Sequence, residues 1–283
     1  MMRTMDKREV VSTIAAELAK GEVAFPTGAQ VAMKVRQALD HPECHIDAAT
    51  KLVQAEPLLA ARAVAMANSV VFNPSGREIS DVRSSVARLG FRTLRSLATA
   101  LVARQMAGNQ LVEPYQGMAA VLWRHTTHVA SLAHVIARRI TRLDPETALF
   151  IGIVHEVGGF YLLSRAKDFP GLLDGDLDFW GGIGEAELGR AVLGVLAVPP
   201  SVLEAMELYW DGFLSMPPKT LADTLLLAEE LAPVASPLHA LGGEGQGEGM
   251  SASIQMAIGD ETLTSILAES NLEVESLIAA LQF

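Results

Sequence analysis

Between Pro114 and Arg139 the apolar residues of this chain recur at intervals of three and four positions. The members of the series are Met118, Val121, Leu122, Val129, Leu132 and Ile136. Residues with this spacing lie on one side of an α-helix, so the segment predicts a long helix that packs against a core. His125 falls on the same side, and we expect its imidazole to point inward.

Other segments share this helical character, and several have typical end signals. Asp144-Pro145-Glu146 combines a capping carboxylate, a proline and an acidic first turn, which predicts a helix start. We expect that helix to end at Gly158-Gly159, since glycine commonly follows a helix. The other expected helices span residues 7–20, 26–41, 47–55, 57–68, 80–89, 92–107, 160–168, 185–196, 200–210, 219–232, 260–268 and 273–282.

Aromatic residues make up only 5% of a chain that is 50% hydrophobic, so its apolar mass is mainly aliphatic. This composition favours packed helices over a β-sandwich, and the predicted fold class is all-α. Four parts are expected: helical subdomains over residues 1–112 and 113–240, a flexible glycine-rich linker over 241–250, and C-terminal helices over 251–283.

The net charge of -11 excludes several partners. A surface of this sign repels phosphate backbones and anionic membranes, so neither nucleic acid nor membrane is an expected partner. We expect no stretch to reach the ~20 apolar residues of a membrane span. Residues 1–20 contain no apolar segment typical of a signal peptide, and the single cysteine, Cys44, cannot form a disulfide within the chain. A cytoplasmic protein is predicted.

Two short motifs carry the candidate chemistry. Trp123-Arg124-His125-Thr126 lies in the long helix, and Gly152-Ile153-Val154-His155-Glu156-Val157-Gly158 follows about thirty residues later. Two histidines on separate helices, with a carboxylate beside the second, could converge on a divalent metal. The alternative is a buried site in which a protonated histidine pairs with Glu156, since a lone buried carboxylate is costly.

In this order and spacing, the motifs resemble those of the HDOD family, regulatory relatives of the HD-domain metal-dependent phosphohydrolases. The resemblance covers Phe25 to Leu231. It includes the helix from Phe25, Glu56-Pro57-Leu58, Ala67-Asn68-Ser69, Val86-Ala87-Arg88-Leu89-Gly90, both histidine motifs and Ala186-Glu187-Leu188-Gly189. It implies an HD-domain-like multi-helix bundle with an N-terminal helical subdomain. For most members it implies bacterial signal transduction without demonstrated hydrolysis.

The resemblance also implies a metal site, which is degenerate here. His125 and His155 match the two histidines, and Glu156 stands where HD enzymes have aspartate. Glu229 is the best match to the later aspartate, although Asp223 and Glu230 lie on the same helix. The lysine of active phosphodiesterases is replaced by Gly159, and Tyr209 with Trp210 stands where a further histidine is expected.

A hydrolase of this kind needs a metal to activate water and a cation to meet the developing phosphate charge. We therefore predict a non-catalytic signalling module that binds a partner protein or small ligand in trans, with the groove between its two helical halves as the ligand site. No cofactor is expected. The alternative is a phosphohydrolase that acts on a nucleotide or other phosphoester, with Fe, Mn, Ni or Zn held by His125, His155, Glu156 and Glu229.

Two further groups are assigned to structure. Arg88, Arg92 and Arg95 could form an anion-binding patch, but we expect salt links to the many acidic residues. Four histidines have no partner at ligand spacing: His41, His45, His134 and His239.

Overall fold

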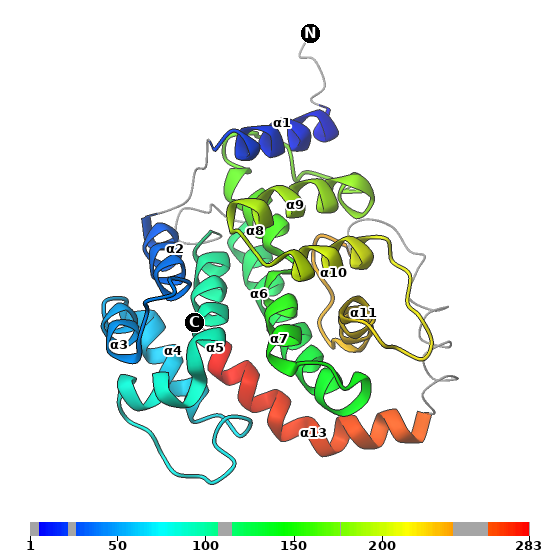
Figure 1. Ribbon diagram of the computed structural model, residues 1–283. Helices are drawn as coiled ribbons and strands as arrows, with labels where there is room; N and C mark the ends of the chain where they lie inside the picture. Colours follow the sequence, from blue (N-terminus) through cyan, green and yellow to red (C-terminus); the bar gives the residue numbers. More distant parts are fainter. Residues whose placement is uncertain (1–5, 22–26, 107–114, 176, 240–259, 283) are drawn as a thin grey trace.

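The long periodic segment forms α6 (Tyr115–Ile136), which lies at the centre of the molecule between α5, α7 and α11 (Figure 1). In this computed structural model, residues 6–21, 27–106, 115–175, 177–239 and 260–282 are described. Within those ranges the protein is helical and has no strand, as predicted. The predicted linker over 241–250 lies outside them.

The first part of the chain contributes five described helices, of which the last four pack together and the first lies apart from them (Figure 1). They are α1 (Lys7–Ala19), α2 (Thr27–Leu39), α3 (Ile46–Gln54), α4 (Pro57–Ala67) and α5 (Val82–Met106). Helix α5 packs against α2, α3 and α4, whereas α1 packs against α9 in the second part of the chain. Both relations are visible in Figure 1.

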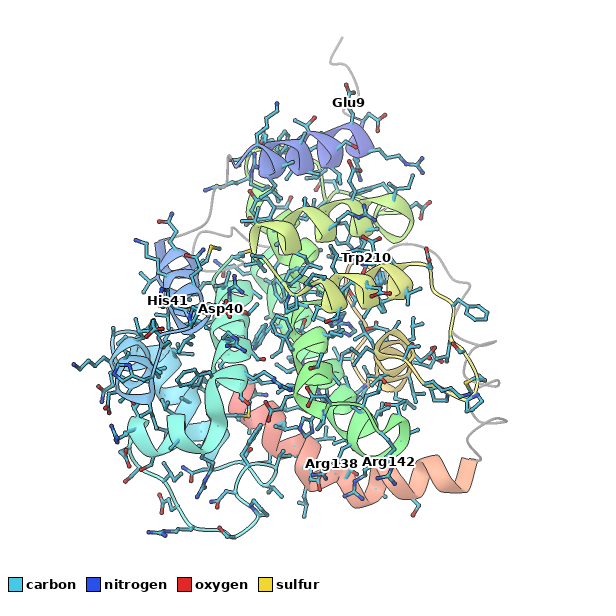
Figure 2. All side chains as sticks on the ribbon, viewed as in Figure 1. Glu9, Asp40, His41, Arg138, Arg142 and Trp210 are labelled. Carbon is cyan, nitrogen blue, oxygen red and sulfur yellow. The ribbon has the colours of Figure 1, made fainter. Side chains whose placement is uncertain are left out.

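The remaining helices complete the core and cover its other side. They are the π-helix Ala137–Thr141, α7 (Pro145–Val154), α8 (Val157–Arg165), the π-helix Trp180–Gly184, α9 (Glu185–Val195), α10 (Pro200–Trp210), α11 (Leu221–Leu231) and α13 (Asp260–Leu281). Helix α13 crosses the molecule beneath α7 and packs against α6 and α4 (Figure 1). Arg138 and Arg139 both form ion pairs with Glu273 of α13. Figure 2 shows Arg138 beside that helix.

Several predicted helix boundaries are wrong, but the predicted division at Gly90 is confirmed, because Gly90 has a non-helical backbone (φ 70°, ψ 170°) that separates the two helical parts of α5. The N-cap is Asp81 rather than Ser80, because Ser84 N–H donates to Asp81 Oδ1 at 2.8 Å. At the C-terminus, α13 is a single helix where two were predicted.

The stretch Pro145–Arg165 is long and apolar enough to cross a membrane, so the expectation that no segment reaches this length was wrong. Within the molecule, 83% of its most apolar window is buried. The stretch is also divided into α7 and α8, which pack against α6 and α9 respectively. Its apolar character is therefore explained by its position in the core.

His134 lies near the C-terminal end of α6, with only 2% of its surface exposed, and its Nδ1 has no hydrogen-bond partner among the described residues. Burial, together with the charge of Arg138, lowers the pKa of His134 to about 4. A folded-state pKa below the unfolded value means that protonation favours unfolding, so stability is lost as pH falls from about 6.5 toward 4.

Between pH 7 and pH 5 we therefore expect the unfolding free energy of the wild type to fall by about 2 kcal/mol more than that of His134→Leu. Urea denaturation at the two pH values measures this difference. Equal losses for both proteins would contradict the assignment of a neutral, buried His134.

Candidate functional site

The site is built where α6 and α7 make their closest approach. Gly152 of α7 lies directly against the backbone of Ala130 in α6, and a Cβ on Gly152 would lie 2.9 Å from Ala130 N and closer still to its Cα. Backbones approach this closely only where one residue has no side chain. The contact brings His125 of α6 and His155, at the end of α7, to the same place.

The helix is interrupted at His155 and Glu156, which separate α7 from α8. The prediction that one helix runs on to Gly158-Gly159 was therefore wrong. Both glycines lie inside α8, where they serve packing. A Cβ on Gly158 would lie 2.9 Å from Gly189 N, and one on Gly159 would lie 2.6 Å from Leu238 Cδ1. The break places the side chains of His155 and Glu156 in the interior, each about 1% exposed.

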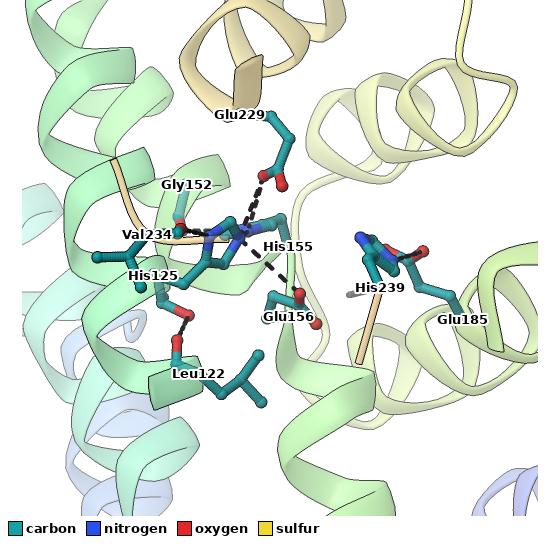
Figure 3. Close-up of polar contacts among 10 residues, drawn as sticks. Leu122, His125, Gly152, His155, Glu156, Glu185, Glu229, Val234 and His239 are labelled. Atoms are coloured by element: carbon teal, nitrogen blue, oxygen red, sulfur yellow. Dashed lines mark hydrogen bonds and ion pairs between the residues drawn. The ribbon is translucent and has the colours of Figure 1, made fainter. Parts of the chain in front are cut away.

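The two imidazoles face each other through their Nε2 atoms, which are 3.1 Å apart (Figure 3). Each Nδ1 lies 2.7 Å from a backbone carbonyl, that of Val234 for His125 and that of Gly152 for His155. A carbonyl oxygen can only accept, so Nδ1 carries the proton in both rings. Both Nε2 atoms are therefore left to share one proton or to bind a common cation.

Two glutamates complete the cluster, so the structure brings together all four of the predicted residues. Glu229 Oε2 lies 3.2 Å from Nε2 of His125 and 3.5 Å from Nε2 of His155. Glu156 Oε1 lies 3.9 Å from Nε2 of His125, and neither of its oxygens has a hydrogen-bond partner among the described residues. Asp223, the other acidic candidate on α11, instead caps that helix through Thr220 N–H.

The pKa values indicate how this cluster is held without a metal. Burial opposes protonation of His125, but Glu229 and Glu156 outweigh it and raise its pKa to about 8. Burial and the neighbouring His125 lower the pKa of His155 to about 4. The raised pKa of His125 and the lowered pKa of His155 both agree with a single proton on the pair, which His125 carries and which faces an ionised Glu229.

The same four residues also fit a divalent metal. Donors bonded to one ion at about 2.0–2.2 Å lie about 3–3.5 Å apart when they are adjacent, and three of the four donor separations given above fall at or close to this range. The Nδ1–H groups donated to carbonyls are typical of metal-bound histidines. The unpartnered carboxylate of Glu156 is a further donor, within 4.8 Å of both histidine nitrogens.

His239 also belongs to the site, although it has no partner at ligand spacing in the sequence. Its Nε2 lies 2.9 Å from Glu185 Oε2, on the far side of Glu156 from the histidine pair (Figure 3). Burial opposes its protonation, but Glu185, Glu156 and Glu229 raise the pKa of His239 to about 10. No spacing in the sequence signals this pair, because its members are 54 residues apart.

The site is closed on the side where HD enzymes have further histidines. The ring of Tyr209 stands nearly perpendicular to that of His155, with centroids 6.1 Å apart, and is 7% exposed. Leu238, fully buried, fills the space beside Gly159. Of the four clustered residues only Glu229 reaches solvent, with 23% of its side chain exposed.

A model of the HDOD domain matches residues 25–173, which is more than half of the chain. None of the curated proteins compared with the chain matches it. Among solved structures, the chain is similar to one from Shewanella amazonensis named "Putative metal-dependent phosphohydrolase" (20% identity, TM-score 0.72, 98% of this chain and 99% of that one).

Two other structures share the fold. An HDOD domain protein with unknown function from Geobacter sulfurreducens is 23% identical, with a TM-score of 0.59 over 96% of this chain and 97% of that one. A "Putative signal transduction protein" from Marinobacter aquaeolei is 18% identical, with a TM-score of 0.57 over 98% of this chain and 66% of that one. With the paired histidines in their expected places, the chain belongs to the HDOD family.

Proposed function

We propose that this protein is a non-hydrolysing signalling module that acts in trans by binding a partner protein or a small ligand. Membership of the HDOD family supports a general role in signal transduction. The observation that carries the rest is the closed cluster around His125 and His155. Its histidines are 0% and 1% exposed, and Tyr209 covers the side on which a substrate would need further contacts.

The described residues around the cluster also offer no lysine or arginine to meet phosphate charge. The position of the lysine in active relatives is Gly159, and Leu238 occupies the adjoining space. Among the described residues outside the cluster, the protonated group that acts on Glu156 and Glu229 is His239, whose Nε2 is hydrogen-bonded to Glu185 rather than to the paired histidines. A phosphoester would therefore find neither room nor a countercharge here.

In this proposal the cluster joins elements that are distant in the sequence. His125 connects α6 to the carbonyl of Val234, and Glu229 connects α11 to both histidines. Buried polar groups that satisfy one another in this way favour a single arrangement of the helices around them. The surfaces that these helices present then have a defined shape for binding.

The packing at Gly159 gives a direct prediction. Gly159→Ala places a methyl group 2.6 Å from Leu238 Cδ1 and 2.8 Å from Glu156 Oε2, so we expect a loss of about 1–2 kcal/mol in unfolding free energy. Gly159→Lys restores the lysine of active relatives, and we expect it to destabilise further without producing phosphatase activity. Urea denaturation and phosphate release measure the two effects. A stable, active Gly159→Lys would contradict the proposal.

The second candidate is a metal-dependent phosphohydrolase, favoured by the convergence of four donors. His125, His155, Glu156 and Glu229 would hold the ion, and a bound divalent metal supplies Lewis-acid chemistry. Elemental analysis of the purified chain, beside the His125→Ala and His155→Ala variants, tests metal binding. Stoichiometric Fe, Mn, Ni or Zn in the wild type alone would identify the cluster as a metal site.

Release of p-nitrophenol tests the proposed function itself, because hydrolysis of either a monoester or a diester of this alcohol produces it. The purified chain, loaded in turn with Mn, Fe, Ni and Zn, is incubated with p-nitrophenyl phosphate and bis(p-nitrophenyl) phosphate. We expect no product above the metal-only blank. Metal-dependent turnover that disappears in His155→Ala would establish the second candidate instead.

A further inference from the structure

A cavity of about 390 Å³ lies between the two parts of the chain, away from the paired histidines. Its wall comes from the C-terminal end of α2, the middle of α5, the N-terminal half of α7 and the connection from α9 to α10. Pockets for small molecules have volumes of about 300–1,000 Å³ and often lie at such junctions.

Three arginines line this cavity, in a chain whose net charge is -11. Arg36 of α2 is only 4% exposed, and its Nε has no hydrogen-bond partner among the described residues. Within the described part of the chain its ion-pair partner is Asp40, whose Oδ2 lies 3.6 Å from Nη1 of Arg36. A buried guanidinium so poorly paired is costly, and burial lowers the pKa of Arg36 from its ordinary value.

The carboxylates nearby do not complete the pairing. Asp40, at the end of α2 beside α5 (Figure 2), is shared by Arg36 and by Arg95, whose Nε lies 3.2 Å away. The second carboxylate of the wall, Glu146, accepts a hydrogen bond from Thr93 at 3.1 Å. Arg92 pairs with Asp144, but the Arg92 side chain is 58% exposed. Exposed ion pairs of this kind are weak, so Arg92 can give up Asp144 for another anion.

The rest of the wall suits a molecule that has an anionic end and an apolar body. Helix α10 begins at the cavity with Pro200 and has no side-chain cap, and helix N-termini attract phosphate groups, whereas the first turn of α7 is already capped by the Asp144 carboxylate. Phe150, Val198 and Val202 form an apolar side. Ala197, between α9 and α10, has a left-handed φ of 46°, a strained conformation that is frequent at ligand sites.

We propose that this cavity binds a small phosphate-bearing molecule of about mononucleotide size, with its phosphate at Arg36 and Arg95 and its ring against Phe150. Guanidinium groups match phosphate oxygens in pairs, and an aromatic ring gives a stacking surface. The assignment rests on the proposed function, since it names the ligand class of a module that binds rather than hydrolyses.

The cavity also adjoins two helices that reach the paired histidines. Helix α7 runs from Glu146 at the cavity to His155 at its C-cap, and α10 runs from Ser201 to Tyr209, whose ring faces His155. A ligand in the cavity therefore contacts the same helices that position the cluster.

Isothermal titration calorimetry of the full chain tests the assignment with AMP, GMP and inorganic phosphate, beside adenosine and succinate as probes without phosphate. We expect a phosphate-bearing probe to bind and adenosine and succinate not to. Arg36→Met should weaken that binding at least about tenfold, because it removes a charged hydrogen bond. Arg83→Met, an exposed arginine on the same α5 as Arg95, should leave it unchanged.

A second variant covers the case in which Arg36→Met fails to fold. Ser201 lies exposed in the first turn of α10, where a glutamate favours the helix, so Ser201→Glu should fold and still repel the anion at the cavity. No binding of any phosphate probe, binding of succinate alone, or equal affinity in Ser201→Glu and wild type would overturn the proposal.

Phosphate release is followed in the same samples, which separates this proposal from the proposed function. Phosphate release from AMP or GMP would contradict the proposed function. The cavity assignment would then still be decided by the binding affinities of the wild type and its variants. Absence of both binding and release would remove the cavity assignment alone.

Discussion

Gly152→Ala is expected to lower the unfolding free energy by about 3 kcal/mol or more. The new methyl group would overlap the backbone of Ala130, and backbone atoms of a central helix cannot move aside as a side chain can. Separating α6 from α7 would also move His155 away from His125, because the Nδ1 of His155 binds the Gly152 carbonyl. Urea denaturation followed by circular dichroism measures the loss.

Gly117 provides the matched control, since it is a helical glycine in α6 with nothing within 4 Å of an added Cβ. Gly117→Ala should stabilise the protein by about 0.5–1 kcal/mol, through the better helix propensity of alanine. A Gly152→Ala variant as stable as Gly117→Ala would show that the two helices do not approach as described.

His155→Ala is the second large effect, with an expected loss of about 3 kcal/mol. The substitution empties a fully buried site beside Tyr209 and removes the hydrogen bond to Gly152, and it leaves Glu229 with one imidazole instead of two. The midpoint of urea denaturation at pH 7 measures it.

His128 is the natural comparison, because it lies one turn from His125 on α6 and is only partly buried. His128→Ala should change stability by no more than about 0.5 kcal/mol. Similar losses for the two variants would mean that His155 is not held in the core.

Much of this fold follows from apolar spacing and helix start signals. The three-and-four spacing of residues 118–136 predicts α6, and Asp144-Pro145 predicts the start of α7, whose cap accepts from Thr147 N–H. Glycine is the ambiguous signal. Gly158 and Gly159 suggest a helix end, yet they lie within α8 because neighbouring groups leave no space for a side chain.

The candidate site was predictable in part. The four clustered residues were chosen on a family pattern, and the structure places them together. The ion pair of His239 with Glu185, the closing contact of Tyr209 and the arginine-lined cavity depend on which helices pack together. Such contacts join residues that have no local relation in the sequence, although Arg88, Arg92 and Arg95 already pointed to an anion-binding patch as the alternative to salt links.

The charge balance of Arg92 and Arg95 shows the same limit. Salt links are expected for Arg88 as well; those of Arg92 and Arg95 are present, to Asp144 and to Asp40, whereas Arg88 donates to the backbone carbonyls of Ala67 and Arg77. The sequence did not indicate that Asp40 is shared with the buried Arg36. The unmet charge at the cavity arises from that sharing.

The central claim is that the paired histidines form a closed structural cluster and do not catalyse. Phosphate release by metal-loaded wild type, measured beside metal-loaded His155→Ala, tests it most directly. We expect both proteins to release no more phosphate than the metal-only blank. Turnover by the wild type that is lost in a folded His155→Ala variant would contradict it.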